Sequence, residues 1–382
     1  NPDIKWERTE STTVGLDLNM FNNRFTASIE YFVKDTKDML LEVPLVYSAG
    51  WADTPYQNAG SIRNKGFEVQ VGWRDQIGNF GYGISGNLTK VNNKVTSLGQ
   101  YGEPVLGGNL STPNKLGYVT RTVLNAPIGT YYGYRNAGIM QESDFDANGK
   151  PLIPVIASSY AYNPGDRKYV DINGDGVIDD NDKTIIGNPH PDFFYAFNIN
   201  LNYKNFDLQM FFQGVQGNEV FNVSKYFLYS NVTYNGSWTS NFDYSNVASD
   251  YISRVYRPEK SSDYRSFYGP NVNGDVPAPT SVSSRGADNF AASDWYIEDG
   301  SYLRLKQLQL NYTFPKSIFK KANIQSLKVY ASVSNLFTLT HYSGLDPEVG
   351  KSIGDEANTS IGIDQGTYPQ ARTFMFGVIF DF

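Results

Sequence analysis

The stretch TVGLDLNMFNNRFTASIEYFVK, residues 13–34, decides the fold. Apolar and polar residues alternate along 13–20, and the alternation resumes along 25–33 after the pair Asn22-Asn23. A period of two residues predicts a β-strand, because successive side chains of a strand point to opposite faces. Asparagine tolerates the positive φ of a tight turn, so the pair between the two runs predicts a hairpin.

The same alternation recurs along the rest of the chain. Three further pairs of runs and one final run follow: 67–73 with 80–89, 193–203 with 206–212, 308–314 with 327–333, and 374–382. Nine strands are therefore predicted. Turns of about two to eleven residues alternate with connections of about 29, 102, 86 and 33 residues, so one edge of the sheet is tight and the other is elaborate. The two longest loops are expected at 91–192 and 215–300.

The two faces of the predicted strands differ in chemistry. Polar residues occupy mid-strand positions opposite the apolar face: Asp17, Glu30, Glu68, Arg74, Asp207, Gln209 and Asn311. Aromatic residues of the apolar face gather near the short turns: Phe25, Trp73, Phe80, Tyr203, Phe206, Tyr312, Phe314 and Phe382. This pattern is typical of an outer-membrane barrel. Its apolar outer face contacts lipid, its polar inner face lines a water-filled lumen, and aromatic residues form a girdle at the periplasmic border. The sequence thus predicts an all-β, antiparallel transmembrane β-barrel segment with short periplasmic turns, long extracellular loops and a surface against the lipid bilayer.

A soluble β-sandwich or propeller also alternates and also uses hairpins, and it is the alternative on patterning alone. The end of the chain favours a barrel, because Gly377, Phe380 and Phe382 have the spacing of the carboxyl-terminal assembly signal of outer-membrane barrels. If Phe382 lies in the periplasm, counting nine strands backwards puts Asn1 on the extracellular side. A complete single-chain barrel does not begin there, so we expect further chain before residue 1.

Composition excludes several classes of function. The net charge of −7 and the absence of any run of Lys or Arg argue against nucleic acid as a partner. There is no cysteine and only two histidines, His190 and His341, which excludes disulfides, thiolate chemistry and the usual zinc sites. We expect both histidines to be structural or solvent-facing, and nothing singles out a carboxylate pair for glycoside hydrolysis. The chain is predicted not to be an enzyme.

Seven stretches together resemble the carboxyl-terminal part of a SusC/RagA-type TonB-dependent outer-membrane transporter. They are NPDIKWE at 1–7, NAGSIRNKGFE at 58–68, PIGTYYGY at 127–134, DINGDGVID at 171–179 with IGNPHPDF at 186–193, SYLRLKQLQLNY at 301–312, SNLFTLTHYSGLDPE at 334–348 and YPQARTFMFG at 368–377. The resemblance covers nearly all of the chain.

Membership of that family implies a 22-stranded barrel with a plug inside it, an N-terminal segment that contacts TonB, and a SusD-like surface lipoprotein as a lid. On that pattern, residues 1–382 are the last nine strands of one barrel domain in the outer membrane of a Gram-negative bacterium. The plug and the TonB-contacting region would lie outside this chain. The implied function is energised import of an oligosaccharide or, alternatively, a peptide.

Residues 171–182 have the spacing of a calcium-binding loop. Oxygen donors fall at loop positions 1, 3, 5, 7, 9 and 12, the seventh through its backbone carbonyl: Asp171, Asn173, Asp175, Val177, Asp179 and Asp182. Gly176 allows the sharp turn at position 6, although Asp182 replaces the usual bidentate Glu. The alternative is a turn rich in Asp, Asn and Gly that needs no ion. We expect calcium in a structural role.

Aromatic residues of the predicted loops are candidate substrate contacts, because aromatic faces stack on sugar rings or grip peptide side chains. They are Tyr131, Tyr132 and Tyr134 beside Arg135, then Tyr226, Tyr229, Tyr234 and Trp238. Packing of loops against one another or against a lid is the alternative for each of them.

The sequence is compatible with three functions. The first is import with a SusD-like lipoprotein, the second is a barrel-anchored surface assembly or adhesion protein, and the third is a soluble glycan-binding β-protein. A plug and a TonB-contacting segment upstream would favour import, whereas a large surface domain there would favour anchoring.

Overall fold

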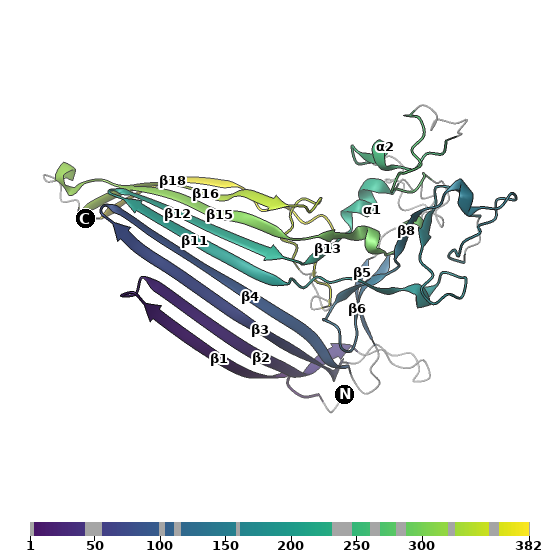
Figure 1. The fold of residues 1–382 in the computed structure, drawn as a ribbon, viewed down its shortest axis with the longest axis horizontal. Coiled ribbons are helices and arrows are strands. Elements are labelled where there is room, and N and C mark those ends of the chain that lie inside the picture. The colour runs from purple at the N-terminus through teal and green to yellow at the C-terminus, as the bar shows by residue number, and fades with distance from the viewer. Residues whose placement is uncertain are drawn as a thin grey trace.

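The computed structural model describes ten ranges of the chain: 4–42, 56–98, 104–110, 116–157, 161–230, 247–259, 268–279, 288–319, 325–350 and 359–381. Nine strands form one antiparallel sheet, and each strand pairs with the sheet strand that follows it in the chain (Figure 1). They are β1 (Arg8–Met20), β2 (Phe25–Glu42), β3 (Tyr56–Ile77), β4 (Phe80–Leu98), β11 (Phe193–Tyr203), β12 (Phe206–Gln216), β15 (Tyr302–Thr313), β16 (Ser326–Thr340) and β18 (Thr373–Asp381). Each predicted run lies within one of these strands, except that Phe314 lies one residue beyond β15 and Phe382 lies outside the described residues.

The short turns and the long connections lie at opposite ends of the sheet, as Figure 1 shows. At the short-turn end, Asn22 and Asn23 have φ of 55° and 62°, and Lys204 has φ of 55°. These left-handed conformations match the twist that a tight hairpin requires. The asymmetric edges predicted from connection lengths are therefore present.

The pairing register gives the sheet one apolar and one polar face. On the polar face, Asp207 lies opposite Asn202 on one side and Asn311 on the other, and Gln209 lies opposite Gln309. On the apolar face, Phe25 and Trp73 pair and their ring centroids are 6.5 Å apart, close to the short turns. The apolar side chains are widely exposed there, as suits a face that meets lipid rather than water. We call the apolar face outer and the polar face inner.

Three neighbouring strands are much longer than a membrane crossing needs. A tilted strand crosses in about 9–11 residues, whereas β2 has 18, β3 has 22 and β4 has 19. The apolar alternation stops near Phe67 on β3 and near Leu88 on β4, and both of these strands continue with charged outer positions. The long loop expected from residue 91 therefore begins only after Leu98.

The long connections contain the remaining elements. Three small sheets consist of β10-β7-β6-β5, β14-β13-β17 and β8-β9. Their strands are β5 (Val105–Leu110), β6 (Gly117–Thr122), β7 (Thr130–Gly133), β8 (Asn136–Ile139), β9 (Arg167–Tyr169), β10 (Thr184–Gly187), β13 (Glu219–Asn222), β14 (Ile297–Asp299) and β17 (Ile363–Asp364). Two short helices are α1 (Ser224–Tyr229) and α2 (Tyr251–Arg254). None of the helices in the described ranges has the length and apolar character to span a membrane.

Candidate functional site

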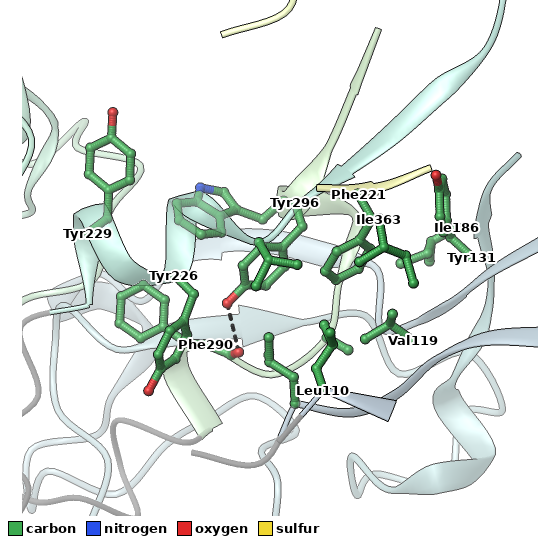
Figure 2. Close-up of a cluster of buried hydrophobic side chains, with 14 of the residues drawn as sticks. Leu110, Val119, Tyr131, Ile186, Phe221, Tyr226, Tyr229, Phe290, Tyr296 and Ile363 are labelled. Carbon is green, nitrogen blue, oxygen red and sulfur yellow. Dashed lines mark hydrogen bonds between the residues drawn. The ribbon is translucent and has the colours of Figure 1, made fainter. Parts of the chain in front are cut away.

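Three long connections fold together at one end of the sheet into a unit that we call the loop assembly. It consists of the described residues within 99–192, 217–301 and 341–372. Its core contains side chains from all three connections, and Figure 2 shows them packed side by side. Val119 and Tyr131 come from the first, Phe221 and Tyr296 from the second, and Ile363 from the third. The three connections therefore form one packed unit rather than independent loops.

Aromatic stacking and buried hydrogen bonds order this core. The ring of Phe221 stacks on Tyr296 with centroids 5.0 Å apart and an interplanar angle of 11°. The Tyr296 hydroxyl donates to the Phe290 carbonyl at 2.9 Å (Figure 2). The Tyr131 hydroxyl donates to the Gly362 carbonyl at 2.8 Å, which joins the first connection to the third. Burial raises the pKa of both hydroxyls, so they remain neutral donors.

This core accounts for several predicted substrate contacts. Tyr131, Tyr226 and Tyr229 are buried within it, and their rings pack against the side chains of the core. Tyr134 is also buried, with its ring centroid 5.0 Å from that of Tyr169 in a neighbouring cluster. None of these four side chains offers a free ring face to a ligand.

Two of the predicted contacts remain accessible. Tyr132 is partly exposed, and Arg121 donates to its hydroxyl at 2.6 Å while lying 4.6 Å from its ring centroid. Arg135 is exposed. Tyr234 and Trp238 lie outside the described residues.

A buried ion-pair network holds the third connection against the inner wall. The Arg304 guanidinium on β15 donates to Asp346, to Glu348 at 2.7 Å and to the Thr338 hydroxyl at 2.8 Å. Arg304 and Asp346 are only 2% and 4% exposed. Lys306 adds a second contact to Glu348 at 2.8 Å. The network fixes the segment after β16 across the mouth of the sheet.

Backbone donors complete the shell of Asp346. Its carboxylate accepts from the N–H groups of Gln370 and Glu348, both at 2.9 Å. Burial alone would raise the pKa of Asp346, but these two N–H groups and Arg304 outweigh it and hold the pKa below its ordinary value. No motif in the sequence predicts this network. The only signal was a lone arginine on a polar strand face and two acidic residues in the following connection, which do not specify a pair.

The predicted calcium loop closes on itself through its first and last carboxylates. Asp171 accepts from the N–H groups of Gly174 at 2.6 Å and Gly176 at 2.9 Å. Asp182 accepts from the N–H groups of Ile172 and Asp179, each at 2.8 Å. Gly174 and Gly176 have φ of 76° and 86°, the left-handed backbone that the turn needs.

The donors of this loop suit a hard cation, since all of them are oxygens. Asp182 is buried, yet the N–H groups of Asp179 and Ile172 lower its pKa, which keeps it anionic. Within the described ranges, no three His, Asp or Glu side chains are gathered closely enough to hold a metal ion. The carboxylates of Asp171 and Asp182 accept hydrogen bonds from backbone N–H groups. A turn that binds no ion would have the same hydrogen bonds.

His190 has the structural role expected for it. Its Nε2 lies 2.8 Å from the Ile128 carbonyl in a partly buried position. Burial lowers its pKa, so the neutral ring donates from Nε2. This contact lies within the first connection and holds its last residues, just before β11, against Ile128.

The inner face is hollowed near the short turns. Gly72, Gly81 and Gly83 fall at inner positions of β3 and β4, and the hollow above them has a volume of about 640 Å³. Polar side chains line its sides, among them Arg74 and Asn200. Glycines remove side chains from the floor, so the inner wall is polar and recessed at this end.

The predicted assembly signal lies on the last strand. Gly377 faces Tyr330 of β16, and a Cβ at that position would lie 2.3 Å from the Tyr330 ring. Phe380 points to the outer face and is widely exposed. Phe382 lies outside the described residues.

Comparison with known proteins identifies the family. The family model described as "TonB dependent receptor-like, beta-barrel" matches residues 1–216, more than half of the chain. The chain belongs to this family, and the soluble sandwich or propeller is therefore not its fold.

Relatives named as TonB-dependent receptors match along the whole chain. TonB-dependent receptor P3 of Formosa agariphila is 32% identical over 384 residues, which are 99% of this chain and 34% of that protein. TonB-dependent receptor SusC of Bacteroides thetaiotaomicron is 27% identical over 399 residues, which are 100% of this chain and 32% of that protein. The chain spans about a third of the length of these curated relatives.

Solved structures share the fold. "Structure of the RagAB peptide transporter" superimposes with a TM-score of 0.71 at 22% identity, covering 99% of this chain and 35% of that chain. The same importer in its "open-open" state gives 0.68 at 23% identity, covering 100% and 35%. These matches show that the fold of this chain is shared with about a third of each of those longer chains.

Proposed function

We propose that this chain forms the membrane wall and the outer loops of a TonB-dependent importer in the outer membrane. The observation that carries the proposal is the nine-stranded sheet with an apolar outer face, a polar inner face and a folded loop assembly at one end. Family membership supports an outer-membrane barrel. A plug and a TonB-contacting region would belong to parts of the protein beyond this chain.

The residues of this chain have three tasks in such an importer. The outer face of the sheet meets lipid, and the polar inner face provides hydrogen-bonding groups along the path of the substrate. The loop assembly captures substrate at the extracellular mouth, with Tyr132 and Arg135 as accessible contacts. The Arg304 network keeps the third connection against the wall, so the mouth keeps its shape before substrate arrives.

The substrate class that we propose is an oligosaccharide, with a peptide as the second candidate. Amide and aromatic side chains in the loops suit sugar hydroxyls and ring faces. The RagAB structures are titled as a peptide transporter, which supports the second candidate. A SusD-like surface lipoprotein is proposed as the partner that covers the loop assembly.

Uptake by the full-length protein in its source organism tests this proposal. Cells that carry or lack the gene are supplied with fluorescent oligosaccharides and, separately, with fluorescent peptides. We expect uptake of one class that stops when the proton-motive force is collapsed, and co-purification of a lipoprotein in detergent. Surface binding that persists without internalisation, and that an uncoupler does not change, would favour the surface-anchor alternative instead.

We further propose a structural calcium ion in the loop 171–182. The residues that would hold it are Asp171, Asn173, Asp175, the Val177 carbonyl, Asp179 and Asp182. The ion would offset the repulsion of four carboxylates and stiffen the first long connection. What supports it is the set of oxygen donors at calcium-loop spacing and the two glycines with positive φ.

Limited proteolysis of the full-length protein with calcium or with a chelator tests the ion. Chelation, or Asp171→Ala with Asp175→Ala, should increase cleavage between residues of about 140 and 190. Asp146→Ala is the matched control, since Asp146 caps an ordinary turn in the same connection by accepting from the Asn148 and Lys150 N–H groups. It should keep the calcium dependence. A digestion pattern that is the same with and without calcium would refute the proposal.

A further inference from the structure

The outer face of β3 and β4 changes abruptly from apolar to basic. On β3, Phe67 is the last apolar outer residue, and Lys65 and Arg63 follow it towards the loop assembly. On β4, Lys90 and Lys94 occupy the corresponding outer positions. A strand rises about 3.3 Å per residue, so the distance along β3 from Trp73 to Lys65 is about 26 Å. Because the strands of a barrel are tilted, one crossing of the apolar band takes about 9–11 residues, and the residues from Trp73 to Lys65 make up about one such crossing. The basic residues therefore lie at the extracellular border of the membrane.

The pairing register gathers three lysines around one amide. Lys65 lies directly opposite Asn92, and Lys90 and Lys94 are the outer neighbours of Asn92 on the same strand. Lys65 is thus the diagonal neighbour of both, at Cβ distances of about 7–8 Å. Phe67 lies opposite Lys90 and supplies an apolar border below the amines. We call Lys65, Lys90, Asn92 and Lys94 the lysine cluster.

Nearby carboxylates already have other partners. Asp35 binds Arg63 through two contacts, at 2.7 and 3.0 Å. Glu10 binds Lys37 at 2.7 Å, and Asp38 lies 3.3 Å from Arg8. Within the described ranges, no carboxylate lies in ion-pair distance of any of the three lysines.

The register places no carboxylate opposite Lys94. Its cross-strand partner is Arg63, whose charge Asp35 already balances. Among the described residues, the charge of Lys94 is therefore not balanced across this strand pair. A phosphate between the amines would satisfy several donors at once, and Lys side chains at a membrane border commonly reach headgroups.

We propose that the lysine cluster is a binding site for the phosphate of an outer-leaflet lipid headgroup. The occupant is a lipid with an anionic phosphate, whose acyl chains lie along Phe67 and the apolar band below. The amines and the Asn92 amide bind the phosphate, and the apolar outer face binds the chains. The inference rests on the proposed placement of this face against the outer membrane.

Native mass spectrometry of the full-length protein in neutral detergent tests the site. The probes are phosphorylated lipid A, the same lipid A after removal of its phosphates, and inorganic phosphate. In the cluster variant, Lys65, Lys90 and Lys94 are each changed to Gln. In the control variant, Lys204, Lys316 and Lys328 at the short-turn end are changed to Gln, which alters the charge equally.

We expect phosphorylated lipid A to bind the cluster variant on the order of 100-fold more weakly than the unaltered protein, given about 1 kcal/mol per lysine at an anionic surface. The control variant should bind like the unaltered protein, and lipid A without phosphate should not distinguish the three proteins. If the cluster variant does not fold by heat-modifiable gel migration, Lys65→Gln alone should weaken binding about fivefold.

Equal binding by the unaltered protein and the cluster variant would overturn the proposal. Displacement of lipid A by millimolar inorganic phosphate would overturn it as well, since the site would then take a free anion. Uptake by cells that carry the unaltered protein is measured in parallel. If these cells take up no substrate while phosphorylated lipid A still binds the unaltered protein more tightly than the cluster variant, the result counts against the importer. If they take up substrate but the unaltered protein and the cluster variant bind lipid A equally, the result counts only against this site.

Discussion

Replacing Asp346 by Asn should release the third connection from the inner wall. The substitution keeps the shape of the side chain and removes the charge that faces the buried Arg304. The remaining partner, Glu348, is 2.7 Å from Arg304 but its side chain is 31% exposed. Arg304 would thus retain one partly solvated partner in place of two. The Gln370 and Glu348 N–H groups would also lose an ionised acceptor.

The expected cost follows from the burial of the pair. Breaking a buried ion pair by removing one partner costs about 3–5 kcal/mol, and the lower end applies because Glu348 still pairs with Arg304. About 3 kcal/mol corresponds to roughly two decades in a local opening equilibrium. The free energy of this local opening should fall far more than the stability of the nine-stranded sheet, because Asp346 lies in the connection and not in a strand.

Hydrogen exchange of the full-length protein in detergent measures this directly. Peptides that cover 341–350 and 359–372 should exchange on the order of 100-fold faster in Asp346→Asn. The matched control is Glu10→Gln, which removes one partner of an exposed ion pair on β1 and should leave the exchange of these peptides unchanged. Exchange within twofold of the unaltered protein would refute the assigned role of the network.

The pH dependence of the same peptides gives a second readout. Because the folded pKa of Asp346 is depressed, its contribution is fully present above the unfolded value of about 3.9 and is lost as pH falls through the folded value. Asp346→Asn should abolish that acid-dependent loss of protection. A variant with the same acid dependence as the unaltered protein would show that other carboxylates are responsible.

Three further predictions concern packing and titration. Gly377→Val should impair barrel folding, because its Cβ would lie 2.3 Å from the Tyr330 ring, and Tyr330→Ala should restore heat-modifiable migration. Tyr131→Phe should lower the free energy of local opening by about 1 kcal/mol through loss of the hydroxyl's bond to the Gly362 carbonyl, measured by exchange of β7. The folded pKa of His190 is depressed, so its contribution to the stability of the first connection is present above about pH 6.5 and is lost as pH falls below that value. Protection of this connection from hydrogen exchange should therefore be lower at pH 5 than at pH 8, and His190→Phe should remove the difference.

The strands of the sheet could be predicted because one physical rule governs all of them. A strand between lipid and water must alternate apolar and polar residues. This alternation is visible in the sequence around Leu16 and around Phe197. The outer ends of β2, β3 and β4 were missed because charged pairs such as Asp35 with Arg63 hold them, and such pairs leave no apolar period. Alternation therefore marks the membrane boundary rather than the end of the strand.

The loop assembly could not be predicted in the same way. Its strands are short, such as β9 with three residues, and several pair with strands that are far away in the chain, as β13 does with β14 and β17. Tyr131 and Tyr132 illustrate the difficulty, because adjacent tyrosines in a strand point to opposite faces and only the surrounding connections decide which is buried. The sequence suggested aromatic contacts with substrate, and the structure uses most of the described ones to bind the connections together.

The shared core has a consequence for how the mouth of the barrel can respond to a ligand. β13 of the second connection pairs with β17 of the third, and the Tyr131 hydroxyl of the first reaches the carbonyl next to β17. A partner that binds and orders one connection therefore lowers the cost of ordering the other two. The Arg304 network then ties this unit to β15, a strand of the wall itself. The loop assembly and the inner wall are in this way joined through residues of this chain. In the importer that we propose, this linkage is what would couple binding at the loop assembly to the wall of the barrel.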